Sequence, residues 1–169
     1  MSDKKTAEQY VIRTRELNPD EATHIQHPLN PDSDVRMHPI SAFAGMQRLH
    51  MHYVRVPAGK ESYTPHAQTL QEEYVFIIEG NGTLDINGEQ TPIGPGDYIG
   101  FPTDGAAHHI LNTGTEDLVY LSAGERTDVE VVDLPTHNKI GVFTGRAVQF
   151  FDKDSAQSLS LKDFVRQKP

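Results

Sequence analysis

The sequence predicts an all-β protein made of short antiparallel strands. From Met46 onward, short runs of alternating apolar and polar residues are separated by turn residues. Asn87-Gly88 is the strongest two-residue hairpin signal in the chain. The close spacing of the runs argues against a parallel α/β sheet and favours a sandwich or a barrel, in which closure protects the strand edges. Strands are expected over residues 47–56, 73–79, 83–86, 91–93, 98–101, 107–112, 118–122, 129–134 and 141–151.

The composition narrows the class of protein. The 169 residues suffice for one domain with its own core, and 36% of them are hydrophobic. The net charge is -9 and no basic patch is present, so nucleic acid is not an expected partner. Cysteine is absent, which excludes disulfides and thiolate chemistry. No signal-like segment follows Met1, and the longest apolar run, Tyr74 to Ile78, cannot span a membrane, so we expect a cytoplasmic protein without membrane contact.

The chain divides into three regions by composition. Residues 1–45 are polar and rich in proline, and they predict an irregular arm with a short helix near 6–15 that packs on the barrel or on a partner subunit. Residues 46–134 carry most of the predicted strands. Residues 135–169 predict an extension with an added strand and a short C-terminal helix, for which Ser160 is a suitable N-cap.

A first group of polar residues lies between two predicted strands. Gly59 is followed by His66 and Gln68, and Glu73 opens the next run. Residues two apart on a strand point to the same face, so His66 and Gln68 project together while the small Ala67 faces away. A bend before Glu73 could bring its carboxylate back toward the same point.

A second group starts at Gly96 and ends at Asn112. On a strand, His108, Ile110 and Asn112 share one face, whereas His109 lies on the other. At most one of the two adjacent histidines can therefore point inward.

These two groups resemble the paired motifs of the cupin superfamily, and the chain looks like a small single-domain bacterial-type cupin (a cupin-2 conserved barrel). The spacing after Glu73 and between His108 and Asn112 matches the family motifs. The chain departs from them in two loop lengths and at Gln68, which stands where the first motif has its second histidine. The resemblance covers residues 46–134 and implies a double-stranded β-helix, or jelly-roll barrel.

The resemblance also implies a metal centre. Carried over by position, its ligands are His66, Gln68, Glu73 and His108, which selects His108 over His109. Two imidazoles and a carboxylate suit one divalent metal ion, Fe, Mn, Ni or Zn, with open coordination positions. Gln68 is a weaker, neutral donor, so it either coordinates the ion or holds a water or the substrate. The remaining alternative is a barrel that has lost its metal.

Four further residues are candidates for the substrate pocket. His50 and His52 share a strand face with Val54, and they line the pocket if this face is interior. A polar stripe on the outer surface is the equal alternative. Arg48 has the same phase and could meet an anionic ligand, although an exposed position is more typical of arginine. Tyr98 is a candidate for proton transfer, although its ring also suits the core or the rim.

The run from Glu73 to Glu79 is apolar on both faces, with Val75 and Ile77 in one phase and Tyr74, Phe76 and Ile78 in the other. One face can fill the barrel, whereas the other needs cover from the arm, the C-terminal segment or a second subunit. Cupins of this size are commonly dimers, so the resemblance favours a homodimer.

Two functions are compatible with these features, besides a purely structural barrel. The first is a metal-dependent enzyme acting on a small polar, sugar-like or carboxylic substrate that can be anionic, with sugar-phosphate isomerase or dioxygenase chemistry. The second is a non-catalytic cupin that binds a small molecule. Because a fold does not determine chemistry, the sequence leaves both open.

Overall fold

The computed structural model describes residues 5–145, 147–160 and 164, and it confirms the prediction of an all-β jelly-roll barrel. The strands are β1 (Thr23–Ile25), β2 (Val35–His38), β3 (Leu49–Val56), β4 (Ala67–Gln68), β5 (Glu73–Glu79), β6 (Gly82–Ile86), β7 (Glu89–Ile93), β8 (Tyr98–Phe101), β9 (His108–Leu111), β10 (Leu118–Glu125), β11 (Val129–Leu134), β12 (Lys139–Thr144) and β13 (Ala147–Asp152). The helical segments are short: α1 (Ile40–Phe43) and the 3-10 turns η1 (Ala7–Tyr10), η2 (Thr14–Glu16), η3 (Pro19–Glu21), η4 (Pro135–His137) and η5 (Lys153–Ser155). None of the described helices has the length and hydrophobicity to cross a membrane.

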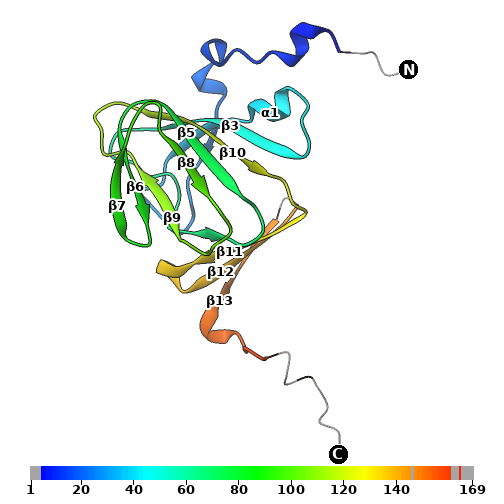
Figure 1. Ribbon diagram of the computed structural model, residues 1–169, viewed down its shortest axis with the longest axis vertical. Helices are drawn as coiled ribbons and strands as arrows, with labels where there is room; N and C mark the ends of the chain where they lie inside the picture. Colours follow the sequence, from blue (N-terminus) through cyan, green and yellow to red (C-terminus); the bar gives the residue numbers. More distant parts are fainter. Residues whose placement is uncertain (1–4, 146, 161–163, 165–169) are drawn as a thin grey trace, which may run out of the picture.

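Three antiparallel sheets enclose the barrel (Figure 1). The first has the order β1-β2-β3-β10-β5-β8, the second β7-β6-β9, and the third β13-β12-β11-β4. The second and third sheets are joined where His66 and His108 exchange backbone hydrogen bonds of 3.2 and 2.8 Å. Two of the predicted metal ligands are therefore held side by side by the backbone itself.

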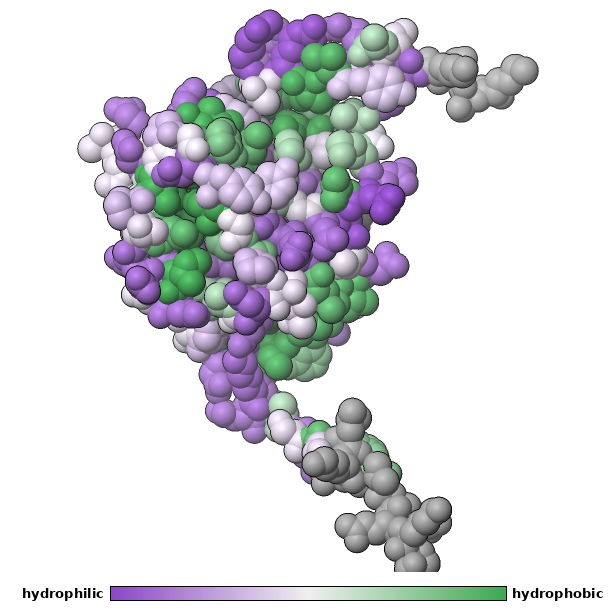
Figure 2. Space-filling model, in the orientation of Figure 1, coloured by the Kyte–Doolittle hydropathy of each residue, from purple (hydrophilic) through white to green (hydrophobic). Residues whose placement is uncertain are grey.

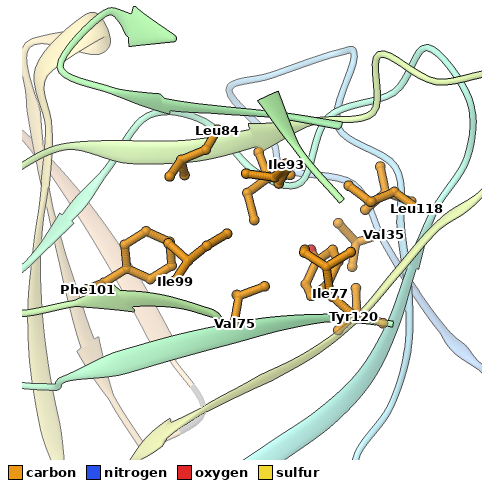
Figure 3. Packing of buried hydrophobic residues seen from close by; sticks show 12 residues of the cluster. Val35, Val75, Ile77, Leu84, Ile93, Ile99, Phe101, Leu118 and Tyr120 are labelled. Atoms are coloured by element: carbon orange, nitrogen blue, oxygen red, sulfur yellow. The ribbon is translucent and has the colours of Figure 1, made fainter. Parts of the chain in front are cut away.

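The apolar core fills one part of the barrel (Figure 3). Its side chains alternate along the strands, as a pleated sheet requires: Val54 and Val56 point inward from β3, and Val75 and Ile77 do so from β5. The remaining members of the buried cluster are Val35, Leu84, Ile93, Ile99, Phe101, Ile110, Leu118 and Tyr120. Since His50 and His52 have the same phase as Val54, they also face the interior, at the other end of β3.

The expected hairpin at Asn87-Gly88 is confirmed. It joins β6 to β7, and both residues have positive φ angles, 54° and 87°. This is the backbone conformation of a type I′ turn, which asparagine and glycine adopt most readily.

The regions flanking the barrel differ in detail from the sequence-based expectations. The helix expected near 6–15 is replaced by the separate turns η1 and η2, whereas residues 23–38 add β1 and β2 to the large sheet. The single strand expected over 141–151 is a hairpin, β12–β13, with a turn at Gly145, where φ is +60°. The C-terminal helix expected over 160–167 lies almost entirely outside the described residues.

Candidate metal centre

His66, Glu73 and His108 converge inside the barrel. One potential ligand atom from each residue lies within 4.8 Å of those of the other two. His66 directly precedes β4, whereas Glu73 and His108 are the first residues of β5 and β9. The two imidazole rings are 4.6 Å apart between centroids. Two successive segments, at residues 66 and 73, and a third at residue 108 thus place two imidazoles and a carboxylate around one point.

Backbone carbonyls orient both imidazoles. Nδ1 of His66 lies 2.9 Å from the Thr64 carbonyl oxygen, and Nδ1 of His108 lies 3.2 Å from that of Ala106. A carbonyl can only accept a hydrogen bond, so each Nδ1 carries a proton, and in the neutral form of such a ring Nε2 has the lone pair that can bind a metal ion. Nε2 of His108 is buried and has no hydrogen-bond partner in the described part of the chain. This arrangement, a ligating nitrogen oriented by a bond from the other ring nitrogen, is typical of metal-binding histidines.

Burial keeps His108 neutral. Phe101 stacks on its ring at a centroid distance of 3.7 Å and an interplanar angle of 8°. Burial, with a further contribution from the charge of His66, lowers the pKa of His108 to about 4. A neutral imidazole is the form that coordinates a metal ion.

Glu73 is held as a carboxylate by its neighbours. Burial acts to raise its pKa, but hydrogen bonds from His50 and Gln68 and the charges of His50 and His66 outweigh burial, so the pKa of Glu73 lies below its usual value. Nε2 of His50 lies 3.3 Å from the carboxylate, and its Nδ1 lies 3.1 Å from the Glu125 carbonyl oxygen. Both neighbouring oxygens are hydrogen-bond acceptors, and the ring of His50 lies between them.

Gly124 makes room for this pair. A Cβ atom at Gly124 would lie 2.9 Å from Cγ of Glu73, 3.0 Å from Cε1 of His50 and 2.7 Å from the Glu72 carbonyl oxygen. Since β10 pairs with β5 at Gly124 and Glu73, a side chain on β10 would push the carboxylate away from the two histidines.

Gln68 lies on β4 beside the three converging residues. Its amide interacts with Glu73, whereas its Oε1 atom is buried and has no hydrogen-bond partner among the described residues. The two orphaned atoms, Oε1 of Gln68 and Nε2 of His108, are both electron-pair donors. Together with the carboxylate, they form a donor set that fits a divalent cation.

A cavity of about 720 Å³ extends from this cluster to the β12–β13 hairpin. His50 and His52 line it, with their rings stacked at 5.1 Å. Burial, with a smaller effect of the charge of His50, lowers the pKa of His52 to about 4. Apolar side chains of the hairpin, Phe143, Val148 and Phe150, also line this cavity.

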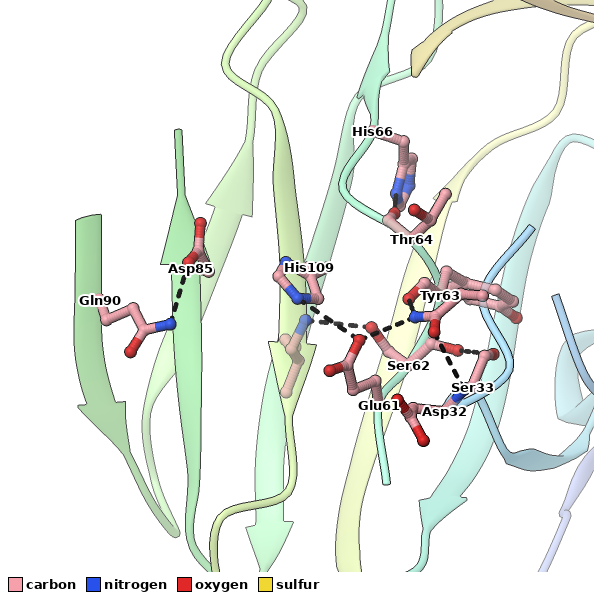
Figure 4. Close-up of polar contacts among 12 residues, drawn as sticks. Asp32, Ser33, Glu61, Ser62, Tyr63, Thr64, His66, Asp85, Gln90 and His109 are labelled. Atoms are coloured by element: carbon pink, nitrogen blue, oxygen red, sulfur yellow. Dashed lines mark hydrogen bonds and ion pairs between the residues drawn. The ribbon is translucent and has the colours of Figure 1, made fainter. Parts of the chain in front are cut away.

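The structure does not bring the other two pocket candidates into this cavity. Arg48 is exposed and contributes nothing to the lining. Tyr98 is 67% exposed and stacks on Tyr74 outside the barrel at 5.6 Å, because its phase on β8 is opposite to that of the buried Ile99 and Phe101. His109 does not join the three-residue cluster either: Figure 4 shows its side chain directed at Glu61, with a separation of 3.7 Å.

Two residues that the sequence analysis did not select line the cavity instead. Arg126 follows β10 directly, and its guanidinium forms no ion pair within the described residues. Glu130 is on β11 in the same phase as the buried Val132 and Leu134. An acid in the apolar phase of a strand is a signal that could have identified Glu130, whereas no local pattern distinguishes Arg126 from Arg48.

Comparisons with known proteins agree with this architecture. A family model described as Cupin domain matches residues 52–124. A protein of Acidithiobacillus ferrooxidans with the provisional name sugar phosphate isomerase is 32% identical, over 92% of this chain and 99% of that one, with a TM-score of 0.86. A sugar phosphate isomerase from a cupin superfamily, of Silicibacter pomeroyi, shares the fold at a TM-score of 0.74 and 22% identity, over 87% of this chain and 98% of that one.

A further relative is the oxalate-binding protein of Thermotoga maritima, which is 28% identical over 112 residues, or 66% of this chain and 90% of that protein. The fold, the histidine-glutamate cluster and these similarities agree. The chain belongs to the cupin superfamily.

Proposed function

We propose that this cupin holds one divalent metal ion, Fe, Mn, Ni or Zn, at His66, Glu73 and His108, with Gln68 at the fourth position. The convergence of three ligand atoms within 4.8 Å, with Nε2 of His108 buried and unpartnered, carries this proposal. When bound, such an ion supplies a Lewis acid, or an O₂ site, facing the cavity. The protein contributes fixed ligands, of which only Glu73 is negatively charged.

The substrate in this proposal is a small anionic molecule of the sugar-like or carboxylic class. The names of the relatives, sugar phosphate isomerase and oxalate-binding protein, both describe ligands of this kind. Arg126 provides the cationic contact in place of Arg48, because it lines the cavity without an ion-pair partner among the described residues. Glu73 is used as a ligand, so proton transfer in an isomerase or dioxygenase reaction falls to His50 or His52.

Elemental analysis of the purified protein tests the metal centre. We expect about one divalent ion per chain in the wild type and less than a tenth of that in His66→Ala and in His108→Ala. His109→Ala is the matched control, because His109 neighbours His108 on β9 but faces Glu61. Equal metal content in all four proteins would refute the proposed centre. Circular dichroism verifies that each variant is folded.

The second candidate is a non-catalytic binder, which the similarity to an oxalate-binding protein favours. Turnover assays with sugar phosphates and small oxo-acids, with and without O₂, separate the two. An enzyme consumes at least one of these compounds in a metal-dependent way, whereas a binder changes only its melting temperature.

A homodimer formed through the outer face of β5 completes the proposal. Phe76 is 39% exposed there, Tyr98 lies beside it across the β5–β8 pair, and Leu49 is exposed on the same sheet. Apolar residues of the arm, including Tyr10 and Ile12, share a pocket with Tyr74 and Tyr98, so the arm covers this face only in part. Figure 2 shows apolar side chains gathered at the surface near α1. Light scattering should give twice the chain mass for the wild type and a monomer for Phe76→Asp.

A further inference from the structure

Glu130 is a buried carboxylate that the metal centre does not use. It is 5% exposed and projects from β11 toward the barrel interior with Val132 and Leu134. Burying a carboxylate is unfavourable unless its oxygens are hydrogen-bonded or paired with a cation. Glu130 forms no ion pair with a described residue, so its hydrogen bonds must account for its position.

The two carboxylate oxygens of Glu130 have different environments. Oε1 accepts three backbone hydrogen bonds, from the N–H groups of Thr69, Leu70 and Val131, at 2.8, 3.1 and 3.0 Å. These bonds fix the carboxylate against the segment that follows Gln68. Oε2 is buried and has no hydrogen-bond partner among the described residues. A structural role, in which Glu130 holds the neighbouring backbone in place, explains the hydrogen bonds of Oε1. It does not explain why Oε2 is buried without a partner.

Glu130 lines the same cavity as Arg126 and the three proposed metal ligands, His66, Glu73 and His108. A group that pairs with Oε2 must be a hydrogen-bond donor, because an ionised carboxylate only accepts. A simple dicarboxylate such as oxalate has no donor at neutral pH. A polyhydroxylated anion has several, in addition to an anionic group for Arg126 and oxygens for the metal ion.

We propose that Oε2 of Glu130 accepts a hydrogen bond from a ligand hydroxyl, and that the cavity therefore selects polyhydroxylated anions, of the sugar-acid or sugar-phosphate type, over simple carboxylates. This inference rests on the proposed function for the position of the anion. It identifies Glu130 as a specificity residue, because a site built around a hydroxyl leaves a buried acceptor unpaired when the hydroxyl is missing.

Two four-carbon monocarboxylates test the inference. D-Erythronate carries three hydroxyl groups, and butanoate has the same chain length and charge without them. Calorimetric titration of the Mn²⁺-loaded wild type should show at least a tenfold preference for erythronate, about 1.4 kcal/mol. Equal affinities in the wild type, including no measurable binding of either acid, would overturn the proposal without any variant.

Glu130→Gln distinguishes the proposed ligand contact of Oε2 from the structural hydrogen bonds of Oε1. The amide oxygen can still accept the three backbone hydrogen bonds, while an NH₂ donor replaces the acceptor Oε2. We expect the preference for erythronate to fall to less than threefold, with the affinity for butanoate unchanged. Glu79→Gln, the same substitution at an exposed carboxylate at the end of β5, is the control and should keep the wild-type preference. A Glu130→Gln protein that retains the full preference refutes the role of Glu130.

A parallel titration with Mn²⁺ alone keeps the two proposals distinguishable. Failure of the wild type to bind Mn²⁺ would refute the metal centre. The comparison of erythronate with butanoate would then be repeated on the metal-free protein. Loss of the preference for erythronate in Glu130→Gln would still support the hydroxyl site. An unchanged preference in that variant would still refute the site. A matching comparison of D-ribose 5-phosphate with inorganic phosphate shows whether the anionic group is a carboxylate or a phosphate.

Discussion

The two ends of the barrel interior are built by the same strands but have opposite character. On β3, Val54 and Val56 pack into the apolar core, whereas His50 and His52 face the cavity. β10 shows the same division: Leu118 belongs to the core, Ser122 lines the cavity, and Tyr120 between them contributes to both. Along each of these strands, every second side chain points into the barrel. These inward side chains are apolar at one end, where they stabilise the core, and polar at the other end, where they line the cavity.

The largest effect that this comparison predicts is on stability. Ile77→Ala removes a fully buried side chain from the apolar end and should lower the free energy of unfolding by about 2–5 kcal/mol. Metal affinity should stay within twofold in the folded protein, because Ile77 does not line the cavity. Urea denaturation and metal titration measure the two quantities. A large loss of metal affinity would show that the two ends are not independent.

The next effect concerns the space beside Glu73. Gly124→Ala places a methyl group against Glu73 and His50, so the carboxylate must shift and metal affinity should fall by about tenfold, or 1.4 kcal/mol. Gly100→Ala is the control, since the nearest atom to its new Cβ lies at 3.5 Å, an ordinary contact. Competition with a chelator gives both affinities. Equal metal affinities of the two variants would mean that metal binding does not depend on the present position of the Glu73 carboxylate.

Gln68→His should act in the opposite direction. An imidazole is a better ligand than an amide oxygen for Ni²⁺ and Zn²⁺, so the affinity for these ions should rise severalfold. Gln71→His makes the same change at a residue that lines the cavity but is not part of the three-residue cluster, and it should have no effect. Unchanged affinity in Gln68→His would place residue 68 outside the coordination sphere, in contact with water or substrate instead.

The smallest effect should be that of Arg126→Gln on an anionic ligand. Arg126 is largely exposed, so its contact is screened by solvent and should contribute about 0.5–1 kcal/mol, or roughly threefold in D-erythronate affinity of the Mn²⁺-loaded protein. Arg48→Gln, at an arginine that does not line the cavity, should leave the affinity unchanged. Fluorescence or calorimetric titration at low salt provides the measurement. The reverse ranking would indicate that Arg48 is the anion contact.

Much of the architecture could be predicted because it depends on local patterns. Alternation identified strands, and the left-handed preference of Asn87-Gly88 identified a hairpin turn. Resemblance to the cupin motifs grouped His66 and Glu73 with His108 rather than with His109, and in the structure His109 lies outside the three-residue cluster, beside Glu61. Alternation was less informative on β5, where both faces are apolar and either one could have pointed inward.

The sequence by itself determined the strands and the main turn, because these follow from neighbours a few positions apart, and its resemblance to the cupin motifs supplied the predicted metal ligands. Only the tertiary structure decided which arginine reaches the cavity, that Tyr98 lies outside it, and that Glu130 carries an oxygen without a partner. These features depend on how the β10–β11 connection, β4 and the β12–β13 hairpin close around one space. Contacts between segments 60 residues apart, such as Glu130 with Leu70, leave no periodic trace in the chain.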